Sequence, residues 1–102
     1  MHARLTSIQL QPGMTERLAD RFSESVLPAS RQQPGFHGGL VLADPATGKT
    51  VLISLWESEA ELQAGETNGY YVEQISKLAG VGLIAGPPVR ETFEVKLEIG
   101  TE

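Results

Sequence analysis

The stretch from Trp56 to Glu61 marks the end of one structural element and the start of the next. An apolar run closes with Trp56, the one tryptophan of the chain, and Ser58 is followed three residues later by Glu61. Serine and glutamate at this spacing form a capping box, in which each side chain satisfies a backbone N–H at the start of a helix. A strand therefore ends at Trp56 and a helix begins at once. This places a large ring with one N–H donor at a strand-to-helix corner, where small domains often open a pocket.

Hydrophobic periodicity in the first half of the chain predicts a strand, a helix and a hairpin. An irregular alternation fits a strand at residues 3–10, and apolar residues at every fourth position fit a helix from Thr15 to near Pro28. Apolar runs at 36–43 and 49–56 flank a turn sequence that contains Asp, Pro and Gly, which predicts a β-hairpin. The order up to this point is strand, helix, strand, strand.

The second half of the chain predicts a broken helix and a final strand. Apolar residues spaced for one helix face continue from Ser58 to Ala79, but Asn68-Gly69 interrupts them, so we expect two helices or one kinked helix. Gly80-Val81-Gly82 and Gly86-Pro87-Pro88 predict a loop. Residues 92–99 then alternate between polar and apolar side chains, which is the clearest strand pattern in the chain and predicts a half-buried strand.

These elements predict an α+β fold of the ferredoxin-like, split βαββαβ type, with a four-stranded antiparallel sheet and both helices on one face. We treat residues 1–102 as one domain, because the sequence has no internal repeat, low-complexity tract or linker. The strand at 49–56 is apolar on both faces, so the sheet face opposite the helices needs cover. A chain of 102 residues has a thin core, and a second subunit is the economical cover.

Composition narrows the classes of function. Acidic residues number 13 and basic ones 8, giving a net charge of −5 without a basic cluster, so we expect no nucleic-acid partner. The absence of cysteine excludes disulfides, thiolate catalysis and thiolate zinc sites, and two distant histidines make a poor metal set. No signal-peptide core and no membrane-length apolar run occur, so we expect a cytoplasmic protein with no membrane contact.

Three segments resemble the antibiotic biosynthesis monooxygenase family in order and spacing: Pro34-Gly35-Phe36, Leu55-Trp56-Glu57-Ser58 and Arg90-Glu91-Thr92-Phe93-Glu94-Val95. The resemblance covers nearly the whole chain. It implies a homodimer whose two sheets face each other to form an α/β barrel, with a small-ligand pocket in each protomer between sheet and helices. Members of this family include cofactor-independent oxygenases of polyphenolic or quinol substrates, haem-degrading enzymes and many proteins with no known activity.

The resemblance directs attention to the residues around Trp56. In similar oxygenases the tryptophan at this position lines the substrate pocket and can donate its N–H to a ligand oxygen, whereas packing of a helix against the sheet is the alternative. Asn68, Tyr70 and Tyr71 either mark a helix break with packed tyrosines, or point an amide and phenols into the pocket. The residues expected to bind a substrate are Trp56, Tyr70, Phe22 and Phe36.

Two further residues are candidates for chemistry on a substrate anion. His37 lies at the start of a strand. It is either a solvated or dimer-contacting histidine, or a general base that can act at the operating pH without special tuning. Arg90 opens the last strand, and it forms either a surface ion pair or an anchor for a phenolate or for reduced oxygen. His2 and Arg4 lie near the N-terminus, where a frayed end is an equal interpretation. The candidate catalytic set is therefore Trp56, Tyr71, Asn68, Arg90 and His37.

The haem-degrading branch of the family uses an asparagine on the first strand, a tryptophan on the third and a histidine ligand in the second helical region. Only Trp56 matches, because the first strand has no asparagine and no histidine follows His37. We therefore expect no haem and no other cofactor. The leading hypothesis that the resemblance implies is a cofactor-independent monooxygenase of a small phenolic or quinol substrate, which itself supplies electrons to O₂. The alternative is a non-catalytic small-ligand-binding or accessory dimer on the same fold. An isomerase or dehydratase would need a buried acid/base pair.

Overall fold

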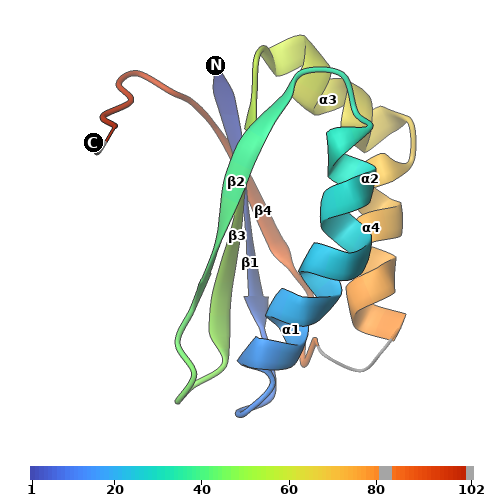
Figure 1. Cartoon of the computed structure of the whole chain (residues 1–102), viewed down its shortest axis with the longest axis vertical. Helices are drawn as coiled ribbons and strands as arrows, with labels where there is room; N and C mark the ends of the chain where they lie inside the picture. The colour runs from blue at the N-terminus through green and yellow to red at the C-terminus, as the bar shows by residue number, and fades with distance from the viewer. Residues whose placement is uncertain (81–83, 101–102) are drawn as a thin grey trace.

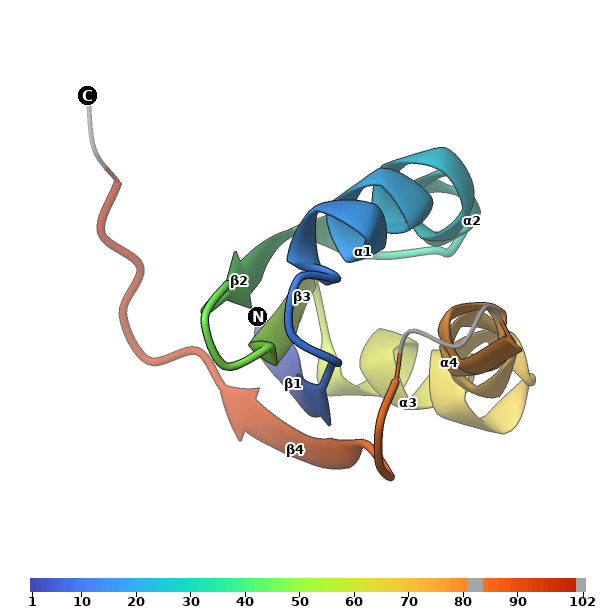
Figure 2. The same ribbon diagram turned by 90° about the horizontal axis from the view of Figure 1, so that it is seen from below.

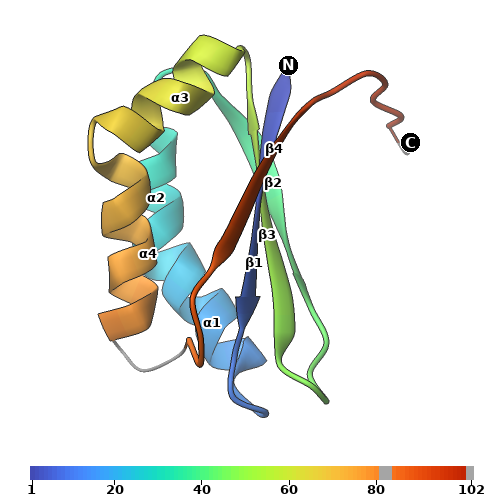
Figure 3. The same cartoon turned by 180° about the vertical axis from the view of Figure 1, so that it is seen from behind.

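The strands pair antiparallel in one sheet, and the helices pack on one of its faces (Figures 1 and 3). The computed structural model describes residues 1–80 and 84–100. In the spatial order β2-β3-β1-β4, the strands are β1 (His2–Gln9), β2 (Phe36–Ala43), β3 (Lys49–Trp56) and β4 (Val89–Glu94). The helices are α1 (Thr15–Arg21), α2 (Leu27–Arg31), α3 (Glu59–Thr67) and α4 (Tyr70–Gly80), with a π-helical turn at Phe22–Val26. The expected ferredoxin-like α+β fold is confirmed.

The last strand is shorter than the alternation at 92–99 predicts. β4 ends at Glu94 opposite His2, and the Val95 N–H then donates to the Met1 carbonyl at 2.9 Å. Residues 96–100 run away from the sheet with no strand of the described chain beside them (Figures 1 and 2). The prediction of a half-buried strand over 92–99 is therefore wrong, because alternation forms a strand only where a neighbour supplies backbone partners. Every residue of β4 is exposed.

The first helical region extends past Pro28, where the sequence predicts its end. The π-helical turn widens the backbone between α1 and α2, and the Leu27 N–H donates to the Phe22 carbonyl across five residues. Pro28 then lies in the first turn of α2, where its missing N–H is not required. The helix therefore continues to Arg31, and the wide turn directs Phe22 and Val26 onto the core.

The second helical region breaks where the sequence predicts. Ser58 is the N-cap of α3, and its Oγ accepts the Glu61 N–H at 3.2 Å while its hydroxyl donates to the Glu61 carboxylate at 3.0 Å. Asn68 ends α3, and its Oδ1 accepts the Tyr70 N–H at 2.9 Å, so α4 begins directly. Two helices result. The expected loop at Gly80-Val81-Gly82 lies mostly outside the described residues.

The core between sheet and helices consists of two clusters. In the first, Trp56 packs with Leu62 of α3 and Tyr70 of α4. The buried members of the second are Ile8, Leu10, Leu18, Val26 and Leu78. Both clusters join the helices to the middle strands β1 and β3, which fixes the helix layer over the sheet at two points.

No helix of the described chain covers the sheet face away from α1 to α4 (Figure 2). This face is apolar, as the pattern of β3 predicts. Val51 and Ile53 of β3 lie opposite Leu42 and Leu40 of β2 on this face. Leu40 is 59% exposed and Phe93 of β4, on the same face, is 49% exposed. A monomer rarely leaves an apolar surface of this kind uncovered.

Candidate functional site

A mostly apolar cavity of about 160 Å³ lies between the sheet and the helices. Its floor comes from β1, β2 and β3, and its helical wall comes from the π-helical turn, α2 and α4. The polar residues that line it are Arg4, Thr6, Ser30, Ser54, Tyr70, Tyr71 and Gln74. A concave apolar pocket with a few polar groups is the usual form of a small-ligand site.

Tyr71 and Thr6 join the helical wall to the floor of the cavity. The Tyr71 hydroxyl, on α4, lies 3.1 Å from Thr6 Oγ1 on β1. Arg4 precedes Thr6 by two residues on the same face of β1, and its guanidinium lies 4.6 Å from the centre of the Tyr71 ring. The guanidinium of Arg90, on β4, lies 5.9 Å from the same ring. Two cations therefore contact one phenol ring, an arrangement that the ring quadrupole favours.

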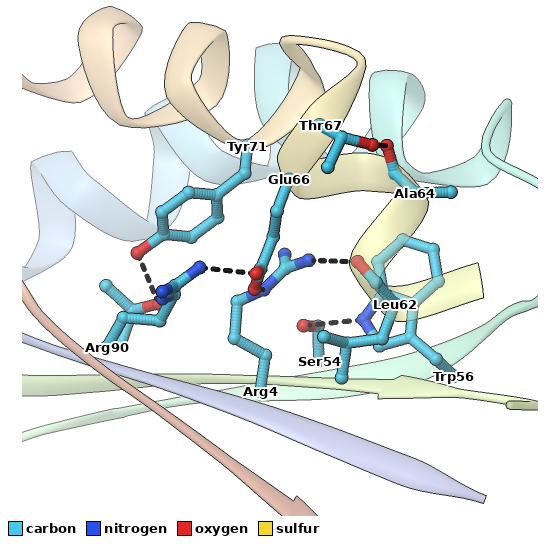
Figure 4. A network of polar contacts seen from close by, with 10 residues as sticks. Arg4, Ser54, Trp56, Leu62, Ala64, Glu66, Thr67, Tyr71 and Arg90 are labelled. Atoms are coloured by element: carbon cyan, nitrogen blue, oxygen red, sulfur yellow. Dashed lines mark hydrogen bonds and ion pairs between the residues drawn. The ribbon is translucent and has the colours of Figure 1, made fainter. Parts of the chain in front are cut away.

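One carboxylate, that of Glu66 on α3, holds both guanidiniums (Figure 4). Glu66 Oε2 accepts from Arg4 Nε at 3.1 Å, and Glu66 Oε1 pairs with Arg90 Nη1. Arg4 Nη2 also donates to the Leu62 carbonyl at 2.9 Å. The exposed fraction of the side chain is 4% for Arg4 and 18% for Glu66. Two cations against one anion leave an excess of one positive charge beside the cavity, which favours an anionic ligand.

Tyr70 makes its polar contact on the opposite, helical wall. Ser30 Oγ donates to the Val26 carbonyl at 3.0 Å, so the hydroxyl that remains to donate between Tyr70 and Ser30 is that of Tyr70. Burial raises the pKa of Tyr70 above its ordinary value, and the hydrogen bond with Ser30 and the charge of Arg4 oppose this only in part. Tyr70 is therefore a neutral phenol whose proton points at Ser30 and whose oxygen retains acceptor capacity.

Trp56 is fully buried, and its N–H is already used within the protein. The indole N–H donates to Ser54 Oγ at 2.9 Å on the same strand. The ring makes edge-to-face contacts with Phe36 at 5.5 Å and Tyr70 at 6.1 Å between centroids, and the Arg4 guanidinium lies 5.5 Å from its centre. Trp56 thus contacts residues that line the cavity without lining it itself. This geometry favours the packing interpretation, and donation to a ligand stays a prediction.

The other predicted site residues fall into two groups. The residues that line the cavity are Phe22, Phe36, Tyr70 and Tyr71. Asn68 lies outside it, where its amide caps the start of α4 and so orients both tyrosines. His37 also lies outside, 40% exposed, with its Nδ1 2.8 Å from Glu57 Oε1. Arg90 lies behind the Tyr71 ring and does not reach the cavity directly.

Sequence reasoning misses two of the most buried polar residues of the site, Arg4 and Thr6, each 3% exposed. The frayed-end interpretation of Arg4 is wrong, because its side chain is enclosed by α3 and the sheet. A signal was available: the apolar residues of β1 divide between both faces, with Leu5 on one and Ile8 on the other, so each face had to carry polar residues. Glu66, on a helix with few apolar residues, carried no comparable signal.

Each of the two histidines pairs with a glutamate. His2 Nε2 lies 3.3 Å from Glu59 Oε2, and His37 pairs with Glu57. Across residues 1–80 and 84–100, no three His, Cys, Asp or Glu side chains gather in a way that could hold a metal ion. A helix with the length and apolar character needed to cross a membrane does not occur in that part of the chain either.

The family model for antibiotic biosynthesis monooxygenase matches residues 1–73. That span includes Arg4, Thr6, Glu66 and Tyr71, and it ends before Arg90. No curated protein sequence is a match to this chain.

Solved structures with the same fold cover nearly the whole chain. A monooxygenase of Streptomyces coelicolor, determined in complex with nanaomycin D, is 18% identical with a TM-score of 0.80, over 99% of this chain and 92% of that chain. A cofactor-independent oxygenase of Streptomyces nogalater is 14% identical with a TM-score of 0.72, over 98% and 97%. A haem degrader of Mycobacterium tuberculosis, with two haems in its active site, is 26% identical with a TM-score of 0.73, over 98% and 100%.

Proposed function

The chain belongs to the antibiotic biosynthesis monooxygenase family, and on that basis we propose that it is a cofactor-independent monooxygenase of a small phenolic or quinol substrate. The observation that carries the proposal is the polar corner of the cavity. There the hydroxyls of Tyr71 and Thr6 meet beside Arg4, in a charge cluster with one positive charge in excess. Apolar walls suit the ring of a phenol, and the excess charge suits its deprotonated oxygen.

In the proposed reaction the substrate supplies every electron that O₂ receives. The phenolate passes one electron to O₂, and the two radicals combine at a ring carbon that carries a hydrogen. The resulting hydroperoxide loses water and leaves a carbonyl at that carbon. One oxygen atom stays in the product, and the other leaves as water with two hydrogens from the substrate, so atoms and electrons balance. The protein contributes desolvation, orientation and charge stabilisation.

Each residue of the site has a role in this proposal. Arg4, Tyr71 and Thr6 hold the substrate oxygen, and Phe22 and Phe36 form the apolar walls. Arg90 adds positive potential through its contact with the Tyr71 ring. Asn68 acts indirectly by fixing the start of α4. The proposal assigns His37 no contact with the substrate, because its ring faces Glu57 outside the cavity.

Oxygen uptake with a panel of quinols and polyphenols tests the proposed function. Quenching of Trp56 fluorescence together with oxygen consumption is expected, because Trp56 packs on Tyr70 at the cavity wall.

Thr6→Val should lower the rate of oxygen uptake about tenfold or more, since a buried hydroxyl that contacts the substrate oxygen is lost. The matched control is Thr67→Val, because Thr67 bonds only within α3 among the described residues and does not line the cavity.

Two outcomes would contradict this assignment. Quenching without oxygen consumption would identify a non-catalytic binding protein on the same fold. An equal loss of activity in Thr6→Val and Thr67→Val would show that the Tyr71 corner is not where the substrate reacts.

A homodimer is the second part of the proposal, and the open apolar face of the sheet supports it. Sedimentation at micromolar concentration is expected to give about twice the chain mass, because a stable interface of roughly 1,200–2,000 Å² would cover this face. Leu42→Asp should give a monomer, since it places a charge on that apolar face, where Leu42 is 49% exposed. Val72→Asp, on the exposed side of α4, is the control and should remain dimeric. A monomer from the unmodified chain would refute the barrel.

A further inference from the structure

We infer that the cavity accepts a ligand with a single aromatic ring and rejects fused ring systems, and that Phe22 sets this limit. The inference deepens the proposed function and rests on it for the phenolic chemistry of the ligand. It concerns the size of the substrate, which neither the fold nor the charge cluster determines.

The volume of the cavity is the first step. An apolar cavity of about 150 Å³ inside a protein is known to bind one benzene molecule. The cavity here has about 160 Å³ and is lined mostly by apolar side chains. One ring with a hydroxyl substituent therefore fills it, and a second fused ring either displaces a wall or stays outside the cavity in water.

Most walls of the cavity are held in place. Phe36 is held by Trp56, and Tyr70 and Tyr71 are held by hydroxyl contacts on opposite walls. Strand β2 is held by its antiparallel ladder with β3, from Gly38 opposite Leu55 to Ala43 opposite Thr50. Closely packed interiors resist the displacement that a second ring would demand.

Phe22 is the aromatic wall that is held by packing alone in the described structure. It is half-buried, it lies in the π-helical turn, and it packs against the edge of the second core cluster. Among the described residues it makes no aromatic pair, unlike Phe36 and Tyr70. Truncation of Phe22 therefore enlarges the cavity and leaves the polar corner intact, which makes this residue the determinant of ligand size.

Gln74 supplies a donor for the ligand within this small volume. It is 6% exposed and lines the cavity from α4, one turn beyond Tyr70. Its Oε1 accepts from Lys77 Nζ at 3.1 Å, whereas its Nε2 has no partner in the hydrogen bonds of the described residues. An amide N–H₂ on the cavity wall can donate to a phenol oxygen.

Calorimetric titration with phenol and with 1-naphthol measures the limit directly, without turnover. Phenol is expected to bind at least tenfold more tightly than 1-naphthol. A site without a size limit would give the opposite order, because naphthol buries more apolar surface. Phe22→Ala should reverse the order in favour of 1-naphthol, and Leu27→Ala, which trims the same wall, serves if Phe22→Ala does not fold.

Matched controls separate the cavity from general effects. Phe93→Ala removes the same ring from the open sheet face and should leave the preference for phenol unchanged. Gln74→Met should weaken phenol binding about fivefold or more, and Gln63→Met, on the exposed surface of α3, should not. Equal or tighter binding of 1-naphthol to the unmodified protein, or no saturable binding of phenol, would overturn the inference.

The size limit and the proposed function fail in different ways. Tighter binding of phenol without oxygen uptake from any quinol keeps the size limit and refutes the monooxygenase. Oxygen uptake from naphthalene quinols at a rate equal to or above that from single-ring quinols keeps the monooxygenase and refutes the size limit.

Discussion

Replacement of Glu66 by alanine is expected to lower the free energy of unfolding by about 3–5 kcal/mol. The reason is that Glu66 is the carboxylate to which both Arg4 and Arg90 are paired. Without it, the Arg4 guanidinium, 4% exposed, keeps the Leu62 carbonyl as an acceptor but has no counter-charge. An uncompensated charge that stays buried is among the most destabilising single changes. Chemical denaturation followed by far-ultraviolet circular dichroism measures the effect.

Two further variants show whether the loss comes from the buried charge. Glu59→Ala removes a glutamate of the same helix that is 61% exposed and pairs with His2, and it should change stability by less than about 0.5 kcal/mol. The double variant Arg4→Met with Glu66→Leu removes both partners and should recover most of the loss. A cost below about 1 kcal/mol for Glu66→Ala would mean that water reaches Arg4.

The order of the elements was predictable because strong local signals mark nearly every boundary. Ser58 caps α3 through the Glu61 N–H, and Asn68 caps α4, so both helix starts follow from side-chain chemistry of adjacent residues. The hairpin turn has the residues that its backbone requires. These signals act over a few residues and need no knowledge of the rest of the fold.

The two errors in the elements come from contacts that local signals do not contain. The length of β4 depends on where β1 supplies backbone partners, and the ladder ends at His2. The continuation of the first helix past Pro28 depends on the π-helical turn, which moves the proline into a first turn. Neither the end of a ladder nor a widened turn is visible in hydrophobic periodicity.

The candidate site was predictable only where aromatic residues mark it. Large aromatic rings are usually buried, and the four that line the cavity are Phe22, Phe36, Tyr70 and Tyr71. The charge cluster was not predictable, because Arg4, Glu66 and Arg90 lie on three elements far apart in sequence. Only the pairing of β1 with β4, and the packing of α3 over β1, brings these charges together.

The deletion of the Trp56 ring is expected to have the second large effect. Trp56→Ala should lower the free energy of unfolding by about 3–5 kcal/mol, because a fully buried ring leaves a cavity among Phe36, Leu62 and Tyr70.

Trp56→Phe separates packing from ligand contact at the same position. A phenyl ring refills most of the space, and the lost N–H leaves Ser54 Oγ without its donor, so about 1–2 kcal/mol is expected. Because that N–H is directed at Ser54 rather than into the cavity, the affinity for phenol in calorimetry should change by less than about twofold. Ser54→Ala, which lines the cavity and removes the same hydrogen bond, is the matched control. A tenfold loss of phenol affinity in Trp56→Phe, with Ser54→Ala unaffected, would show that the indole N–H turns from Ser54 to the ligand oxygen on binding, as the family resemblance implies.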